Sequence, residues 1–168
     1  MRRLLLACLL VLSSCAPSVL GARGWDFRAL RTNAQVRLVD SKDFGFCSAK
    51  MVGCTAPLGQ GCVIMLDQTY FLNGTPTQKT LLLAHEFGHC LDGSRLLYSH
   101  NHVGDSGKVY GPYYRPAVEG FAEAYARAYL KACGTNLALL GWETAPQDRG
   151  AACELPDPKA VRVQPEER

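Results

Sequence analysis

The chain has 168 residues, of which 48% are hydrophobic and 20% are charged, and its formal net charge is +3. This length and composition predict one globular domain whose core can bury most of its apolar side chains. Lysines and arginines are scattered along the chain rather than clustered, which argues against nucleic acid as a partner.

Residues 1–14 have the pattern of an export signal, since Arg2 and Arg3 precede a short apolar run and then small residues. The run is shorter than the about 20 residues that a membrane-spanning helix needs. Leu-Ser-Ser-Cys, which ends at Cys15, also resembles a bacterial lipobox, in which the cysteine is lipidated and becomes the first mature residue. A plain signal that is cut later, for example after Gly21, is the alternative. We therefore expect an exported protein, either anchored in the bacterial cell envelope through a lipid on Cys15 or secreted.

Cysteine usage is also typical of an exported protein. An even number of cysteines follows the signal, which predicts three disulfides, and the sequence does not choose among the fifteen pairings. A zinc site built on these cysteines is disfavoured, because their gaps are irregular and no Cys-x-x-Cys pair occurs. The six are Cys47, Cys54, Cys62, Cys90, Cys133 and Cys153.

The first half of the chain contains strand signals. After an expected tether at residues 15–30, residues 35–39 alternate polar and apolar side chains, which predicts a strand. Residues 43–61 are rich in glycine and cysteine and predict a loop or hairpin held by disulfides. The apolar, partly β-branched run 62–66 predicts a second strand, which we expect at the edge of a sheet.

Two helices are predicted in the second half. Thr75, Pro76 and Gln78 supply an N-cap, a first-position proline and a capping box, so one helix should run to about Leu91 and stop at Gly93. A polar loop over 93–114 precedes a second helix, from about residue 116 to before residue 134, with an apolar stripe. A short helical segment within 134–153 and an extended or disordered tail follow. We expect an α+β domain over 31–155, with a small mixed sheet packed on the two helices and a tail at 156–168.

The first helix carries His-Glu-Phe-Gly-His at residues 85–89. His85 and His89 lie four apart, so their imidazoles share one helix face and reach one metal ion, for which zinc is suited. Glu86 points about 100° round the helix from His85, where a general base can reach a water. Gly88 leaves room for another segment to approach. Two structural histidines are the alternative, but it leaves Glu86 as an unpaired acid in an apolar helix.

A catalytic zinc site needs a third protein ligand and an open position. Asp92 lies well round the helix from the two imidazoles, and His100 and His102 lie on an untethered loop. Glu119 is the best candidate. Glu119 and Glu123 share one face of the second helix, so packing the helices together would bring Glu119 to the zinc. Glu123 could then accept a hydrogen bond from a ligand histidine. The alternative is that both acids are simply solvated.

These motifs resemble a known family. His-Glu-Phe-Gly-His followed by Cys-Leu-Asp, and later Glu-Gly-Phe-Ala-Glu-Ala-Tyr, resembles the gluzincin metallopeptidases over residues 60–132. The likeness is greatest to the catalytic domain of anthrax lethal factor and its small secreted bacterial relatives. The resemblance implies a zincin-like fold, zinc ligands at His85, His89 and Glu119, and Glu86 as the general base.

The resemblance also implies a tyrosine that stabilises the developing oxyanion. Tyr110 and the glycine after it resemble the Tyr-Gly pair of the relatives, although the spacing to Glu119 is longer here. Tyr113 and Tyr114 therefore remain alternatives. The chain lacks the large substrate-binding domains of the toxin, so toxin function is not implied.

We expect an exported zinc-dependent endopeptidase that cleaves peptides or proteins by a metal-activated water, with Glu86 as the base. An extended substrate would pair with the strand at 62–66. One alternative is a non-enzymatic surface protein with a structural zinc site, although such a site has a fourth ligand and needs no base. Another is a zinc amidase that acts on cell-wall peptide.

Overall fold

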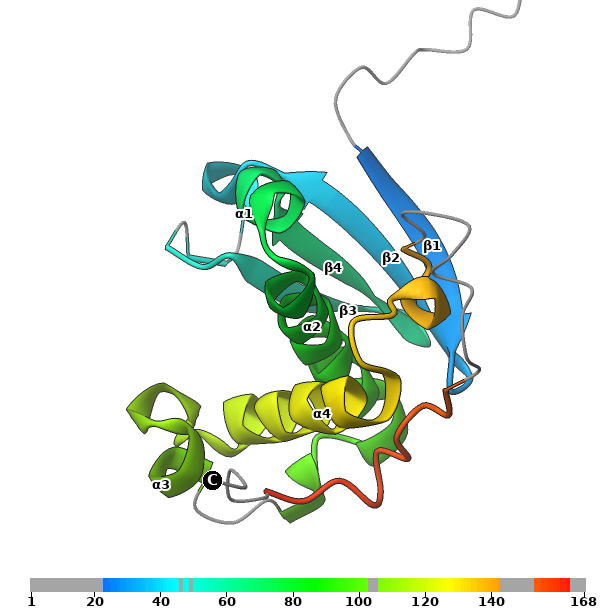
Figure 1. Cartoon of the computed structure of the whole chain (residues 1–168), viewed down its shortest axis with the longest axis vertical. Helices are drawn as coiled ribbons and strands as arrows, with labels where there is room; N and C mark the ends of the chain where they lie inside the picture. Colours follow the sequence, from blue (N-terminus) through cyan, green and yellow to red (C-terminus); the bar gives the residue numbers. More distant parts are fainter. Residues whose placement is uncertain (1–22, 46, 49, 103–105, 143–152, 164–168) are drawn as a thin grey trace, which may run out of the picture.

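A computed structural model describes residues 23–45, 47–48, 50–102, 106–142 and 153–163 (Figure 1). The expected export signal and Cys15 lie outside these ranges. The described residues form a four-stranded mixed sheet and four α-helices, which confirms the α+β class. Among the helices described, none has both the length and the apolar character that crossing a membrane requires.

The sheet has the strand order β1-β2-β4-β3. Its strands are β1 (Arg23–Ala29), β2 (Thr32–Val39), β3 (Gly53–Leu58) and β4 (Gly61–Asp67). Strands β2 and β4 are parallel, whereas β1 pairs with β2 and β3 pairs with β4 in antiparallel fashion.

Strands β2 and β4 confirm the two strands predicted from the sequence, but their surroundings differ from expectation. Strand β4 lies inside the sheet, so its predicted edge position is wrong, and β3 is the edge strand beside it. Residues 43–61 were expected to form a loop or a hairpin held by disulfides, and β3 forms a hairpin with β4, with Cys54 bonded to Cys47. Residues 23–29, which we expected in the tether, form β1, where Trp25 and Phe27 pack against the core.

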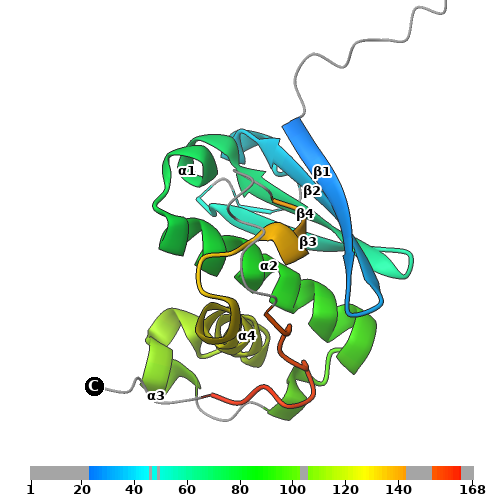
Figure 2. The same cartoon turned by 45° about the vertical axis from the view of Figure 1, so that its right-hand side comes forward.

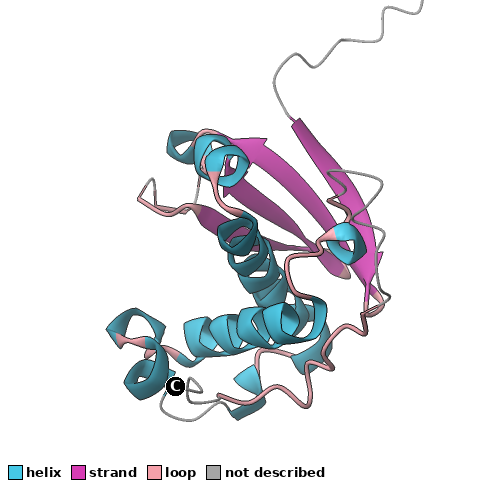
Figure 3. Ribbon diagram, viewed as in Figure 1, coloured by secondary structure: helices cyan, strands magenta, loops and turns pink. Residues whose placement is uncertain are grey.

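The helices are α1 (Gln68–Asn73), α2 (Pro76–Leu96), α3 (Ser106–Tyr110) and α4 (Ala117–Cys133). Helix α2 lies between the sheet on one side and α4 on the other, as Figures 1 and 2 show from two directions. Figure 3 shows the same arrangement by secondary structure, with the sheet on one side of the molecule and the helices gathered on the other. The central helix can therefore bring the sheet and α4 to one site.

The start of α2 confirms the predicted capping box, in which Thr75 and Gln78 satisfy each other's backbone N–H groups. The predicted end is wrong, because the helix continues through Gly93 to Leu96. Gly93 does not terminate the helix but makes room for the ring of Tyr98, since a Cβ there would lie 3.0 Å from the ring. Leu97 takes the left-handed cap conformation instead.

The remaining segments follow the sequence in part. Helix α4 has the predicted extent, and a short 3₁₀ helix at Ala138–Leu140 confirms the expected helical segment. The predicted loop 93–114 instead contains the end of α2 and helix α3. Residues 153–163 are without helix or strand apart from a turn at 158–160, and they are anchored, since three of their backbone carbonyls lie within hydrogen-bond distance of Asn101 Nδ2 and share its two protons.

Three disulfides pair all six cysteines, as predicted. They join Cys47 to Cys54, Cys62 to Cys90, and Cys133 to Cys153. The second bond joins β4 directly to α2, in the middle of the molecule. This usage fits a protein that folds outside the reducing cytosol.

Helices α2 and α4 approach each other closely at Gly88, which leaves room for another segment as the sequence predicts. A Cβ at Gly88 would lie 2.9 Å from the Cα atom of Ala122 and 3.2 Å from its carbonyl oxygen. Real Cβ atoms do not come so near to backbone that cannot move. The absence of a side chain at Gly88 therefore sets the distance between the two helices.

We predict that Gly88→Ala separates the helices and destabilises the fold by about 1 to 3 kcal/mol through overpacking. Gly93→Ala on the same helix is the matched control. It meets only the half-exposed ring of Tyr98, which can move, and it gains about 1 kcal/mol of helix propensity. Urea unfolding checks both variants, and equal stabilities would contradict this account of Gly88.

Candidate metal centre

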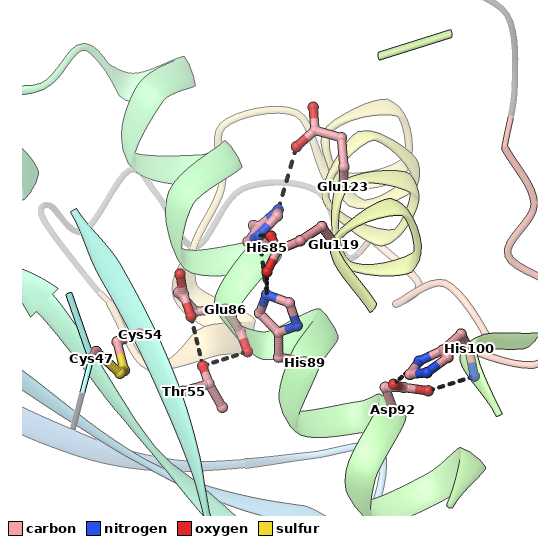
Figure 4. Close-up of polar contacts among 10 residues, drawn as sticks. All are labelled: Cys47, Cys54, Thr55, His85, Glu86, His89, Asp92, His100, Glu119 and Glu123. Atoms are coloured by element: carbon pink, nitrogen blue, oxygen red, sulfur yellow. Dashed lines mark hydrogen bonds and ion pairs between the residues drawn. A yellow bond between two sulfur atoms is a disulfide. The ribbon is translucent and has the colours of Figure 1, made fainter. Parts of the chain in front are cut away.

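The side chains of His85, His89 and Glu119 converge where α2 meets α4 (Figure 4). His85 Nε2 lies 3.2 Å from His89 Nε2 and 3.2 Å from Glu119 Oε2. His89 Nε2 lies 3.7 Å from Glu119 Oε1. The structure therefore brings together the three residues that the sequence proposed as ligands.

These separations fit a bound metal ion. A tetrahedral ion with bonds of about 2.0 to 2.2 Å holds its ligand atoms about 3.3 to 3.6 Å apart. One ligand atom from each of the three residues lies within 4.8 Å of the others. Two nitrogens and a carboxylate oxygen could thus bind one ion and leave a coordination position free.

Glu123 determines which nitrogen of His85 faces this centre. Its Oε2 lies 3.4 Å from His85 Nδ1, while Arg127 Nε donates to its Oε1 at 2.8 Å. A carboxylate only accepts hydrogen bonds, so Nδ1 carries the proton and the neutral His85 presents the lone pair of Nε2. That lone pair points toward the Glu119 carboxylate and the ring of His89. Such a convergence of electron pairs requires a proton or a cation among them.

The pKa shifts of His85 and Glu119 also show that the centre favours a positive charge. Burial favours neutral His85, but the carboxylates of Glu119 and Glu123 outweigh it and raise the pKa of His85 to about 9. Burial likewise opposes ionisation of Glu119, yet His85 and His89 hold its pKa below its usual range. The centre therefore attracts a cation.

Glu86 lies on the other side of His85, facing strand β3. Its side chain is buried, and Thr55 Oγ1 lies 2.7 Å from Oε2. Burial raises the pKa of this carboxyl, while the nearby histidines and the Thr55 hydroxyl oppose the rise. Glu86 is not one of the converging ligands, as expected from its direction on the helix.

A cleft passes the centre on both sides. One cavity of about 430 Å³ extends along β3 toward the end of α2 and is bounded by the start of α4. Another of about 550 Å³ extends toward the first half of α2 and the middle of α4. Both are lined by His85, Glu86 and Tyr113. The centre therefore lies between two cavities that share part of its lining.

Asp92 and His100 do not join the centre. Asp92 is fully buried further along α2 and accepts hydrogen bonds from the backbone N–H and the ring of His100 (Figure 4). This pair fixes a turn in which Leu97, Tyr98, His100 and a neighbouring asparagine have positive φ. The side chain of His102 lies outside the described part of the structure.

The three tyrosines lie at different places. Tyr110 packs beside the core with the Arg127 guanidinium 4.8 Å from its ring centre, and it lines neither cavity. Tyr113 lines both cavities, and Tyr114 lines one. Burial and then the charges of Glu119 and Glu86 raise the pKa of Tyr113, so its hydroxyl keeps its proton at neutral pH.

Two contacts of the site were missed from the sequence. Arg127 lies four residues after Glu123 on α4, a spacing that predicts an ion pair and could have revealed it. Thr55 lies 31 positions before Glu86 in a segment expected to be a loop or hairpin, so no sequence signal indicates their contact.

Comparison with known proteins found no matching family model, no matching curated protein and no matching solved structure.

We predict that metal binding releases a proton from His85. A pKa of about 9 means that this imidazole is protonated at pH 7 in the metal-free protein. Metal and proton compete for the same centre, so the apparent affinity for Zn²⁺ should rise about tenfold per pH unit from pH 7 toward pH 9.

Calorimetry at pH 7 in two buffers of different ionisation enthalpy measures the number of protons released. We expect about one proton from His85 for each ion bound. An identical binding enthalpy in both buffers would contradict the expectation.

Proposed function

We propose that this protein is an exported zinc-dependent endopeptidase with a zincin-like fold, as its resemblance to the gluzincins implies. One observation carries the proposal: three ligand side chains from two helices meet beside a buried glutamate in an open cleft. His85, His89 and Glu119 would hold the ion, with Glu123 supporting His85.

The donor set supports zinc as the ion and a catalytic rather than a structural role. Zinc is suited to two imidazoles and a carboxylate, and structural zinc sites have four protein ligands. Within the described residues, the only group of metal-ligating side chains that converges in this way has three members. Three protein ligands and one free coordination position favour a catalytic zinc site over a structural one.

Zinc at this centre supplies a Lewis acid that lowers the pKa of a water to about 7. Glu86 lies next to a ligand histidine, and burial raises its pKa above the usual value for a glutamate, which makes its carboxylate a stronger base. Its carboxylate accepts a proton from the attacking water and passes it to the amine that leaves. Zinc and Glu86 would thus activate the water together, and Glu86 would protonate the leaving amine.

Tyr113 is the tyrosine best suited to stabilise the oxyanion. It lines the cleft on both sides of the centre, and its pKa is raised, so its hydroxyl can donate a hydrogen bond. We propose it in place of Tyr110, which packs beside the core and lines neither cavity.

The cleft favours cleavage within a chain rather than at its end. Cavities on both sides of the centre would accept residues before and after the broken bond. Exposed apolar side chains border them, including Val52, Tyr70, Tyr98 and Tyr113. Such a border favours a peptide or protein substrate. Edge strand β3 replaces β4 as the strand with which an extended substrate could pair.

Export is proposed on two grounds. The signal-like residues 1–14 and the three disulfides both fit a protein outside the cytosol. A lipid on Cys15 would attach the protein to a membrane, and the mass of the mature chain measures whether it is present.

We predict that Glu86→Gln lowers kcat by about 10² to 10⁴-fold, because it removes the general base. One zinc ion should remain bound, since Glu86 is not a ligand. Glu123→Gln is the matched control. It should weaken zinc affinity by about 10 to 100-fold, because an uncharged amide replaces the carboxylate that supports His85.

The substrate for this test is a library of peptides blocked at both ends, with peptidoglycan in a parallel assay. Metal analysis and cleavage of blocked peptides are measured on the same samples. Cleavage by Glu86→Gln at the wild-type rate would refute the assignment of Glu86. A zinc-loaded wild type that cleaves neither substrate would point to a non-enzymatic protein, and cleavage of peptidoglycan alone to a cell-wall amidase.

We predict that Tyr113→Phe lowers kcat by about 10²-fold, as loss of an oxyanion donor does. Tyr110→Phe and Tyr114→Phe remove the same hydroxyl nearby and should have smaller effects. Steady-state kinetics of the three variants ranks them. A larger loss in Tyr110→Phe than in Tyr113→Phe would restore the tyrosine implied by the family resemblance.

A further inference from the structure

We infer that Thr55 and Gly53, on edge strand β3, act as positioning residues that hold the Glu86 carboxyl in its working orientation. The inference rests on the proposed function, in which Glu86 is the general base. It assigns a role in that function to strand β3, which carries none of the proposed metal ligands.

Thr55 contacts Glu86 at two places (Figure 4). Its Oγ1 lies 2.7 Å from the carboxyl oxygen Oε2 and 3.0 Å from the main-chain carbonyl oxygen of the same residue. One hydroxyl has one proton to donate, and a charged carboxylate is the stronger acceptor. Thr55 therefore donates its proton to ionised Glu86 through Oε2, and the main-chain oxygen is a second acceptor within reach of the same hydroxyl.

Gly53 bounds the other carboxyl oxygen. A Cβ at this position would lie 2.3 Å from Glu86 Oε1 and 2.8 Å from a methyl carbon of Leu82. The backbone of β3 thus occupies the space next to Oε1, while Thr55 engages Oε2. Both oxygens of the carboxyl are in contact with the same strand, and no larger residue than glycine fits at position 53 without moving Glu86.

The strand that makes these contacts is itself restrained. Cys54 lies between the two residues, is 3% exposed and is bonded to Cys47 in the preceding loop. On its other side β3 pairs with β4 over its full length. Glu86 is therefore held by a rigid support rather than by a mobile loop.

Orientation matters because a glutamate side chain has three rotatable bonds and a base must lie within hydrogen-bond reach of its proton. A misplacement of about 1 Å in an active site can cost about 10²-fold in rate. The ligand histidines cannot supply this control, because Glu86 points away from their face of α2.

The test compares Thr55→Val, which keeps the shape and removes the hydroxyl, with Thr55→Ser, which keeps the hydroxyl. We expect kcat to fall about 10 to 100-fold in Thr55→Val with KM and zinc content unchanged, and most of the activity to return in Thr55→Ser. Equal kcat in Thr55→Val and wild type, or a fall in zinc content that accounts for the loss, would overturn the inference.

A second measurement does not depend on activity. The ¹³C carboxyl resonance of Glu86 is recorded in the metal-free wild type, Thr55→Val, Thr55→Ser and Gly53→Ala. It should move in Thr55→Val and Gly53→Ala and stay near the wild-type position in Thr55→Ser. A resonance that stays at the wild-type position in both Thr55→Val and Gly53→Ala would overturn the inference. A wild type without hydrolytic activity would instead refute the proposed function, while this resonance would still report on the contact.

Discussion

The close approach of α2 and α4 at Gly88 is the constraint on which the rest of the site depends. Two imidazoles on one helix cannot complete a metal site, and the carboxylate they need is carried by the other helix. That carboxylate reaches them because the backbone of Ala122 lies where a side chain at position 88 would be. The absence of a side chain at Gly88 thus allows both the close contact of the two helices and the convergence of the three side chains that could hold an ion.

Charge is organised outward from this contact. The imidazole of His85 lies between two carboxylates, those of Glu119 and Glu123, and Arg127 neutralises part of the second. Arg127, Glu123, His85 and Glu119 thus form a row whose charges alternate in sign when His85 is protonated. Each group stabilises the ionised form of its neighbour. Without an ion, a raised pKa lets a proton serve as the missing positive charge on His85. The same row would accept a metal in place of that proton.

Local signals predicted much of this arrangement. The capping box at Thr75 and the four-residue spacing of His85 and His89 are properties of a few neighbouring residues, so they were readable from the sequence. The acid pair on α4 was readable too, because two acids interrupt an apolar stripe. By contrast, the contact of Thr55 with Glu86 depends on how a hairpin folds over a helix, and nothing local encodes it.

The predicted end of α2 was wrong for the same reason, since contacts distant in the sequence determine it. Gly93 has the chemistry of a stop signal, but the helix continues because Tyr98 folds back over it and Asp92 holds the turn that follows. The sequence left residues 43–61 open between a loop and a hairpin, because the intrinsic preference of 53–58 for strand is weak and its pairing with β4 and the bond from Cys54 to Cys47 are tertiary contacts. Tertiary contacts decided these cases.

The bond between Cys62 and Cys90 affects how the centre would bind an ion. Cys90 directly follows His89, so the turn of helix that carries this ligand is covalently attached to an inner strand of the sheet. Its backbone has little freedom left to lose when an ion arrives. An ion would therefore enter a site whose backbone is already in place, and its loss would leave the surrounding fold intact.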